Sequence, residues 1–168
     1  MNNLSKLLLA GVCLAIGNAA WADEITRHPL PNFPTSLAVE VPAGASTIYL
    51  NGVVPGIIDN KADPRSEAAY GNTAQQTANV LAEIEKRLKS LGLGMSDVVK
   101  MQVFLVADPA KGNKMDFAGF MRGYTQFFGT AAQPNLPARS AFQIAALANP
   151  AWYVEIEVVA VRAAKPVK

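Results

Sequence analysis

The residues best suited to chemistry are an arginine and two glutamates near the end of the chain. Arg139 stands in segment 138–147, and Glu155 and Glu157 stand in segment 152–161. Both segments have the apolar, alternating composition that predicts strands. A guanidinium holds a carboxylate through two parallel hydrogen bonds, and a nearby glutamate can orient and deprotonate a water. Arginine and glutamate in one pocket would therefore suit the hydration of a small substrate that carries a carboxylate.

Alternation along these strands predicts which side chains share a face. One face of segment 152–161 is purely apolar and suits a position under helices. The opposite face carries Glu155 and Glu157 followed by two valines, so we expect it to be half buried, as if another subunit covered part of it. If the two strands pair as a hairpin, Arg139 and one glutamate can approach each other on this uncovered face. A structural salt bridge at a subunit interface is the alternative that the residues alone leave open.

Composition excludes several other kinds of site. The chain has 168 residues, of which 51% are hydrophobic and 17% charged, which indicates one folded domain with a substantial core. One cysteine and one histidine are too few for a zinc site or a disulfide framework. A net charge of +2, with scattered basic residues, gives no surface for nucleic acid.

Residues 1–22 have the pattern of a secretory signal peptide. Lys6 supplies the positive charge, residues 7–16 are apolar but too short to span a bilayer, and Ala20-Trp21-Ala22 resembles a cleavage site. We therefore expect a cleaved leader, one domain over 23–168 and a periplasmic or secreted protein. Cleavage would also remove the only cysteine.

The remaining pattern predicts an α+β fold with the order β-β-α-β-α-β-β. Segments 36–41 and 46–51 predict a hairpin, followed by a loop over 52–71. The first helix is expected over 73–91, with a capping box formed by Thr73 and Gln76. The other predicted elements are a strand, a helix and two strands, over 95–107, 114–128, 138–147 and 152–161. A single mixed sheet with both helices on one face accommodates this order.

Short motifs across nearly the whole of 23–168 resemble those of the reactive-intermediate deaminase (Rid, YjgF-type) family, in order and approximate spacing. The most specific are Pro137-Ala138-Arg139-Ser140 and the downstream Glu155-Ile156-Glu157. The others are Pro34-Thr35-Ser36-Leu37-Ala38-Val39, Asn51-Gly52-Val53-Val54-Pro55, Gln75-Gln76-Thr77, Asp97-Val98-Val99-Lys100 and Tyr124-Thr125-Gln126-Phe127-Phe128.

The resemblance implies a chorismate-mutase-like fold and a homotrimer with ligand clefts between adjacent subunits. It implies that Arg139 holds the substrate carboxylate, that Glu155 positions the attacking water and that Gly52 lines the cleft with its backbone. Neither a metal nor an organic cofactor is implied. Asn51, Tyr124 and Ala141, in or beside matched motifs, are expected at the same substrate site. Only the resemblance favours Glu155 over Glu157, because alternation places both on one face.

Three positions depart from the family pattern. Thr35 stands where many deaminating members have an aromatic residue, Ala141 where a cysteine is frequent and Met121 where an asparagine is common. Loss of these aromatic and polar groups suggests a more apolar ligand.

The activity that the resemblance implies is hydrolytic deamination of small enamines and imines, such as 2-aminoacrylate, to 2-keto acids and ammonia. Two alternatives remain from other classes. One is a non-catalytic trimeric binding module for small carboxylates, and the other is a holdase-type chaperone. No membrane span and no nucleic-acid partner are expected.

Overall fold

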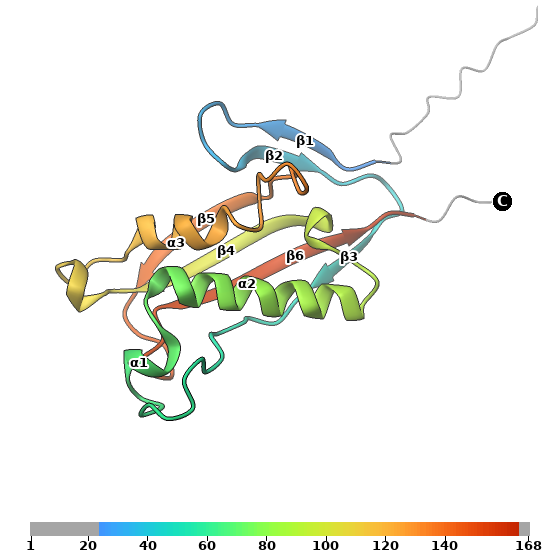
Figure 1. The fold of residues 1–168 in the computed structure, drawn as a ribbon. Coiled ribbons are helices and arrows are strands. Elements are labelled where there is room, and N and C mark those ends of the chain that lie inside the picture. The colour runs from blue at the N-terminus through green and yellow to red at the C-terminus, as the bar shows by residue number, and fades with distance from the viewer. Residues whose placement is uncertain (1–23, 165–168) are drawn as a thin grey trace, which may run out of the picture.

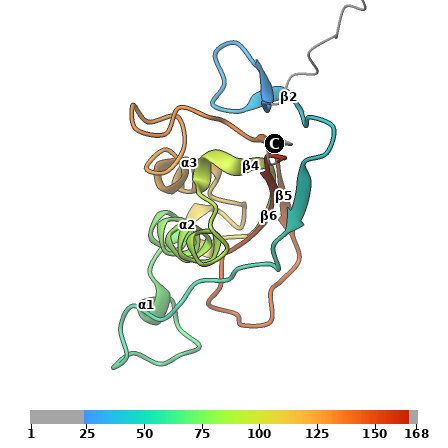
Figure 2. The ribbon, with the colours of Figure 1, turned by 90° about the vertical axis from the view of Figure 1, so that its right-hand side faces the viewer.

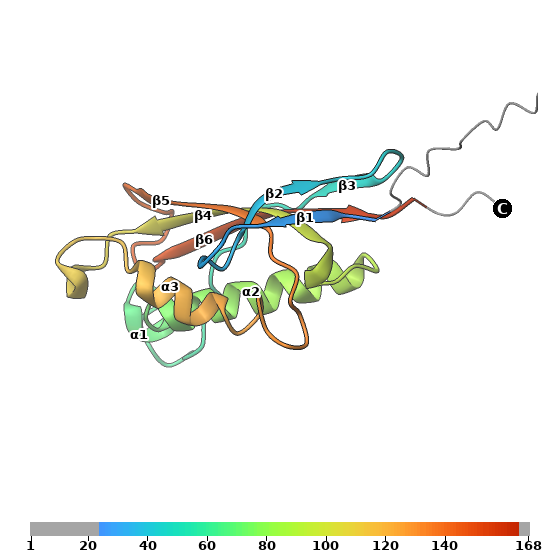
Figure 3. The same ribbon diagram turned by 90° about the horizontal axis from the view of Figure 1, so that it is seen from above.

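A computed structural model describes residues 24–164, and these form one layer of strands and one layer of helices. The two longer helices lie on the same side of the sheet, and no helix of the described residues lies on its other face (Figure 3). The predicted leader, 1–22, lies outside the described residues. Within the described part, no helix is long and apolar enough to cross a membrane.

The main sheet contains four strands in the order β3-β6-β4-β5. These are β3 (Ser46–Tyr49), β6 (Val154–Arg162), β4 (Val98–Val106) and β5 (Ala138–Ile144). The β4–β5 pair is parallel and the other two pairs are antiparallel, which confirms the predicted mixed sheet. β4 occupies the interior of the sheet, and its alternating residues Met101, Val103 and Leu105 are fully buried under the helices.

The helices lie on one side of the sheet, where α2 (Thr73–Ser90) and α3 (Phe117–Tyr124) cover its buried face (Figure 2). The longest is α2, followed by α3 and the single turn α1 (Glu67–Tyr70). Two short 3₁₀ turns, η1 (Met95–Asp97) and η2 (Pro109–Lys111), flank β4. Thr77, Leu81, Ile84 and Leu88 of α2 are all fully buried, as their helical spacing predicts. Leu91, which the same spacing places on this face, is instead 46% exposed.

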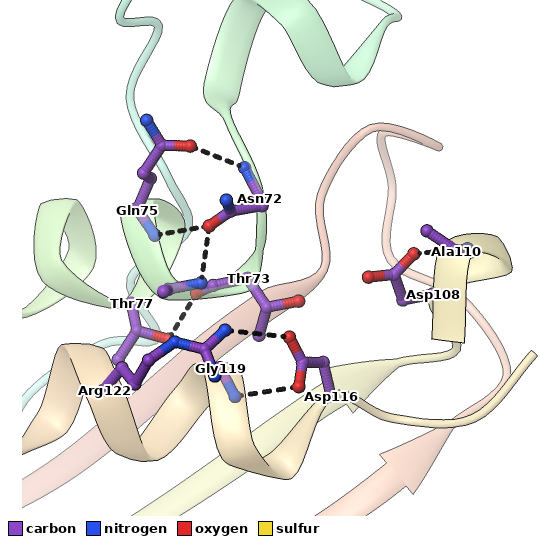
Figure 4. A network of polar contacts seen from close by, with 10 residues as sticks. Asn72, Thr73, Gln75, Thr77, Asp108, Ala110, Asp116, Gly119 and Arg122 are labelled. Atoms are coloured by element: carbon purple, nitrogen blue, oxygen red, sulfur yellow. Dashed lines mark hydrogen bonds and ion pairs between the residues drawn. The ribbon is translucent and has the colours of Figure 1, made fainter. Parts of the chain in front are cut away.

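The start of α2 differs by one residue from the predicted capping box. The side chain of Asn72 accepts hydrogen bonds from the backbone N–H groups of Ala74 and Gln75, and Gln75 accepts one from the N–H of Asn72 (Figure 4). Thr73 and Gln76 are instead buried, and Gln76 bonds to backbone groups in the loop before β6. Asparagine forms the cap because its amide oxygen reaches two free N–H groups of the first turn.

The helix α3 is shorter than the predicted range 114–128. Lys114 is held in an isolated β-bridge to Asp108, so the helix begins only after Asp116, whose carboxylate accepts a hydrogen bond from the N–H of Gly119 at 2.8 Å. Gly123 lies against α2: a methyl group there would come within 2.8 Å of the Ala74 carbonyl. The absence of a side chain therefore allows the two helices to approach closely.

A separate two-stranded ribbon precedes the main sheet. β1 (Thr26–Pro29) pairs antiparallel with β2 (Ser36–Glu40), and the ribbon lies beside β5 (Figure 1). The predicted hairpin between segments 36–41 and 46–51 is therefore wrong, because β2 pairs with β1 whereas β3 pairs with β6. The turn after Pro42 carries the chain from one sheet to the other, so β2 pairs with the strand just before it, whereas β3 pairs with the distant β6.

Candidate functional site

Arg139 lies on β5, at the edge of the main sheet and on the face that α3 covers. Its register partner on β4 is the buried Met101, so both side chains point toward the helices. The guanidinium carbon lies within 6 Å of four aromatic ring centres. These belong to Tyr124 at 4.7 Å, Phe120 at 4.9 Å, Phe117 at 5.7 Å and Phe33 at 5.8 Å. Aromatic faces attract a cation, so this group of rings stabilises the charge of Arg139.

The guanidinium nevertheless lacks an anionic partner. Across residues 24–164 it forms no ion pair, and its Nη2 donates a hydrogen bond to the sulfur of Met121 at 3.5 Å. Its Nε–H is buried without an acceptor in the same part of the chain. Burial lowers the pKa of Arg139, but a guanidinium stays charged at physiological pH. A half-buried cation without a counter-charge is a favourable place for an anion to bind.

Tyr124 lies beneath this cation rather than beside it. The tyrosine is fully buried, and its ring stacks on Phe128 at 5.0 Å. Burial raises the pKa of Tyr124 to about 12, against a smaller lowering by the charge of Arg139, so the phenol stays neutral. The structure therefore places Tyr124 in contact with Arg139 and away from solvent.

The N-terminal ribbon holds the segment that leads into Arg139. Thr35 donates a hydrogen bond from its hydroxyl to the carbonyl of Pro137 at 2.7 Å, and Ser36 donates one to the carbonyl of Leu136 at 2.6 Å. Arg27 donates a third from Nε, also to Leu136, at 3.2 Å. These bonds fix the backbone just before Arg139 and bring the ring of Phe33 over its guanidinium.

Glu155 and Glu157 lie on the open face of the sheet, as alternation predicts. Their neighbours Val154, Ile156 and Val158 are buried under the helices, whereas both glutamates remain half exposed. Gly52 lies against Glu155: a side chain at position 52 would overlap the Glu155 carboxylate. The structure thus places side by side two residues that the resemblance assigns to one site.

The predicted meeting of Arg139 with a glutamate on the uncovered face is wrong for a single chain. β5 and β6 do not form a hairpin, because β4 lies between them. Arg139 points to the helix side and Glu155 to the open side of the same sheet. The helix α3 causes this arrangement, since it carries the chain from β4 to β5 as a crossover and makes those two strands parallel.

A pocket of about 310 Å³ opens on the face that bears the glutamates. Asn51 and Gly52 line one side of it, and Lys100, Gln102 and Glu157 line another. This volume suits a small organic molecule, and the lining combines backbone groups with both signs of charge. Glu157 is thus the acid that lines this pocket, whereas Glu155 contacts the neighbouring Gly52.

Ala141 and two residues that the sequence did not indicate complete the surroundings of Arg139. Ala141 follows Arg139 by two positions on β5 and packs against the core. Phe33 and Arg27 lie before residue 36, in a segment for which the sequence predicted no helix or strand. The one feature of the sequence that could have indicated a contact with Arg139 is Phe33 itself, an isolated aromatic residue between Asn32 and Pro34. Among residues 24–164, no cluster of three His, Cys, Asp or Glu side chains could hold a metal ion.

Comparisons with known proteins agree with this architecture. A model of the family described as Endoribonuclease L-PSP matches residues 43–162. The mouse protein named 2-iminobutanoate/2-iminopropanoate deaminase is 33% identical over 138 residues, which cover 82% of this chain and 87% of the relative.

Solved structures give the same result for the fold. The structure of E. coli TdcF with bound serine is 28% identical, with a TM-score of 0.55 and coverage of 82% of this chain and 94% of that one. NMB1025 from Neisseria meningitidis, described as a member of the YjgF protein family, is 27% identical with a TM-score of 0.50. It covers 86% of this chain and 98% of its own. These neighbours confirm the predicted YjgF-type fold.

Proposed function

Because the chain belongs to the Endoribonuclease L-PSP family of YjgF, Rid and RutC proteins, we propose that it hydrolyses small imines and enamines to 2-keto acids and ammonia. The observation that carries the proposal is the unpaired cation of Arg139 in its group of aromatic rings. A 2-imino acid offers the carboxylate that this cation lacks. The deaminase name of the mouse relative supports the same chemistry.

The proposed reaction needs only a held substrate and an oriented water. Arg139 binds the carboxylate of R–C(=NH)–COO⁻ through paired hydrogen bonds, and Glu155 accepts a proton as water adds to the imine carbon. Glu155 passes that proton to the nitrogen, which gives the carbinolamine. The same carboxylate then moves the hydroxyl proton to the amino group, so the C–N bond breaks, the carbonyl forms and ammonia leaves. Substrate, water and one carboxylate account for every atom and proton. Fixing the substrate beside the water supplies most of the catalytic advantage.

We propose that the complete site forms between two copies of the chain. Arg139 lies at the β5 edge on the helix side, and Glu155 lies on the open face, so one chain supplies two separate halves. The open face bears Tyr49, 79% exposed, and Phe142, 42% exposed, next to its carboxylates. A second copy covering that face would bury this apolar surface. The homotrimer that the resemblance implies would contain three such interfaces.

The central test measures ammonia and keto-acid release from imines generated in situ by an amino-acid oxidase. We expect the chain from residue 23 onward to accelerate release above the rate in buffer, and Arg139→Ala to lose at least about tenfold in kcat/KM. Arg65→Ala is the matched control, since Arg65 is an exposed arginine on the loop before α1. Comparison of Glu155→Gln with Glu157→Gln identifies the acid, and we expect the larger loss for Glu155→Gln. A wild-type rate equal to that of buffer for all imines contradicts the proposal.

A binding module remains the second candidate, because the E. coli TdcF structure was determined with bound serine. Calorimetry with 2-keto acids tests it on the same variants. Binding that Arg139→Ala abolishes, together with no turnover by wild type, would favour this function instead. The net charge of +2 gives little attraction for an RNA backbone, so the family's description as a ribonuclease carries less weight than the geometry around Arg139.

A further inference from the structure

The accessible surroundings of Arg139 are apolar. Phe120 and Tyr124 are fully buried beneath the guanidinium, so a ligand must approach from the side bordered by Phe33, Phe117 and Met121. Phe33 is 45% exposed, and the other two are partly buried. A carboxylate paired with Arg139 therefore places its α-carbon beside two aromatic rings and a thioether.

The polar groups near this approach are already engaged or covered. The hydroxyl of Thr35 is committed to the carbonyl of Pro137, and the side chain is 5% exposed. The hydroxyl of Tyr124 has no hydrogen-bond partner among residues 24–164, but it is buried beneath the guanidinium with the rest of its ring. Ala141 presents only a methyl group on the same strand face as Arg139. On the exposed side of Arg139, none of these three side chains therefore meets a polar substituent on the substrate.

We propose that the site selects 2-imino acids with bulky apolar side chains, such as those derived from leucine or phenylalanine, over the three-carbon imine derived from alanine. The inference rests on the proposed function and adds the substrate class. Each methylene removed from water against Phe33, Phe117 or Met121 contributes roughly a fourfold gain in binding. A polar side chain of equal size would lose its water contacts without replacement.

The experiment compares kcat/KM for imines derived from alanine, leucine, phenylalanine and asparagine. Leucine and asparagine form a size-matched pair that differs in polarity. We expect the leucine-derived and phenylalanine-derived imines to exceed the alanine-derived one at least about tenfold, and the asparagine-derived imine to show no such gain. Met121→Asn and Phe33→Ala should each lower the leucine-to-alanine ratio. Leu37→Asn, at a side chain that is 68% exposed on β2, is the control and should keep the ratio.

A binding measurement separates the two proposals. Calorimetry with 4-methyl-2-oxopentanoate and pyruvate compares the matching keto acids on wild type and on Met121→Asn. If the protein binds the larger keto acid more tightly but hydrolyses no imine, the deaminase proposal is wrong and the proposed selectivity for apolar side chains still holds. Turnover of the alanine-derived imine equal to or faster than that of the leucine-derived one would overturn the selectivity and keep the deaminase. Equal binding of the two keto acids by the wild-type protein would also overturn the proposed selectivity.

Discussion

The hydroxyl of Thr35 donates a hydrogen bond of 2.7 Å to the carbonyl of Pro137, two residues before Arg139. The bond crosses from the N-terminal ribbon to the main sheet and is almost completely buried. Thr35 therefore acts on the proposed carboxylate site through the backbone that leads into Arg139. The resemblance leads us to expect an aromatic residue at this position, and the threonine found there instead fixes the backbone that leads into Arg139.

Replacement of Thr35 by valine tests this positioning role. The variant keeps the shape of the side chain but loses the hydrogen bond, so we expect the free energy of unfolding to fall by about 1 kcal/mol. KM for an imino acid should rise more than kcat falls, because the binding of the carboxylate is affected first. Urea unfolding and steady-state kinetics measure the two effects. Thr35→Ser, which retains the hydroxyl, should recover KM, and a valine variant with wild-type stability and KM would contradict the role.

Replacement of Gly52 by alanine tests the contact with Glu155. The added methyl group overlaps the Glu155 carboxylate, which is the flexible end of a side chain and can move aside. We therefore expect the melting temperature to change little and the deaminase rate to fall about tenfold or more. Gly56→Ala is the control, since its methyl group would meet only Asn79, at 3.4 Å. Full activity in Gly52→Ala would show that the position of Glu155 does not matter for turnover.

A mixing experiment tests the site between copies. Arg139→Ala and Glu155→Gln should each be nearly inactive alone. When they are unfolded together and refolded as mixed oligomers, about a quarter of the interfaces should combine an intact arginine with an intact glutamate. Activity should then return to about a quarter of the wild-type value. Activity that stays at the level of the separate variants, in mixtures shown by mass spectrometry to contain both chains, would exclude a shared site.

The buried phenol of Tyr124 predicts a loss of stability in alkali. Its pKa is about 12 in the folded chain and near 10 when unfolded, so the unfolded state releases its proton first as the pH rises. Ionisation of Tyr124 in the unfolded state should therefore lower the free energy of unfolding by about 1 kcal/mol between pH 9.5 and pH 11. Tyr124→Phe should remove that part of the decline, as measured by urea unfolding at several pH values. Tyr49→Phe, at a ring that is 79% exposed, should decline like wild type, and an identical decline in Tyr124→Phe would contradict the assignment.

The long helix α2 and the two faces of the last strand could be predicted because each depends on local periodicity. The buried side of α2 consists of apolar residues at helical spacing, among them Leu81, Ile84 and Leu88. Alternation likewise places Glu155 and Glu157 on the open face. Both patterns record which side of an element avoids water, and that information is present in a single sequence.

The partners of β3 and β5 could not be predicted because they depend on distant segments. β2 does form a hairpin, but with the preceding strand β1, which the sequence did not predict, and β3 pairs instead with β6 near the end of the chain. Arg139 itself belongs to a strand whose parallel pairing with β4 turns its side chain toward α3. Alternation fixes that Arg139 and Ala141 share a face, but only the topology of the sheet decides which face it is.

The side chain of Arg27 also bonds to the carbonyls of Ser96 and Val98, so this one residue joins three segments of the chain. Its partners follow it by 69 to 109 positions. During synthesis the ribbon emerges early but must wait for Leu136 before it can dock. Contacts of such long separation form slowly, so we expect attachment of the ribbon to be a late event in folding and the Arg139 segment to become ordered only then.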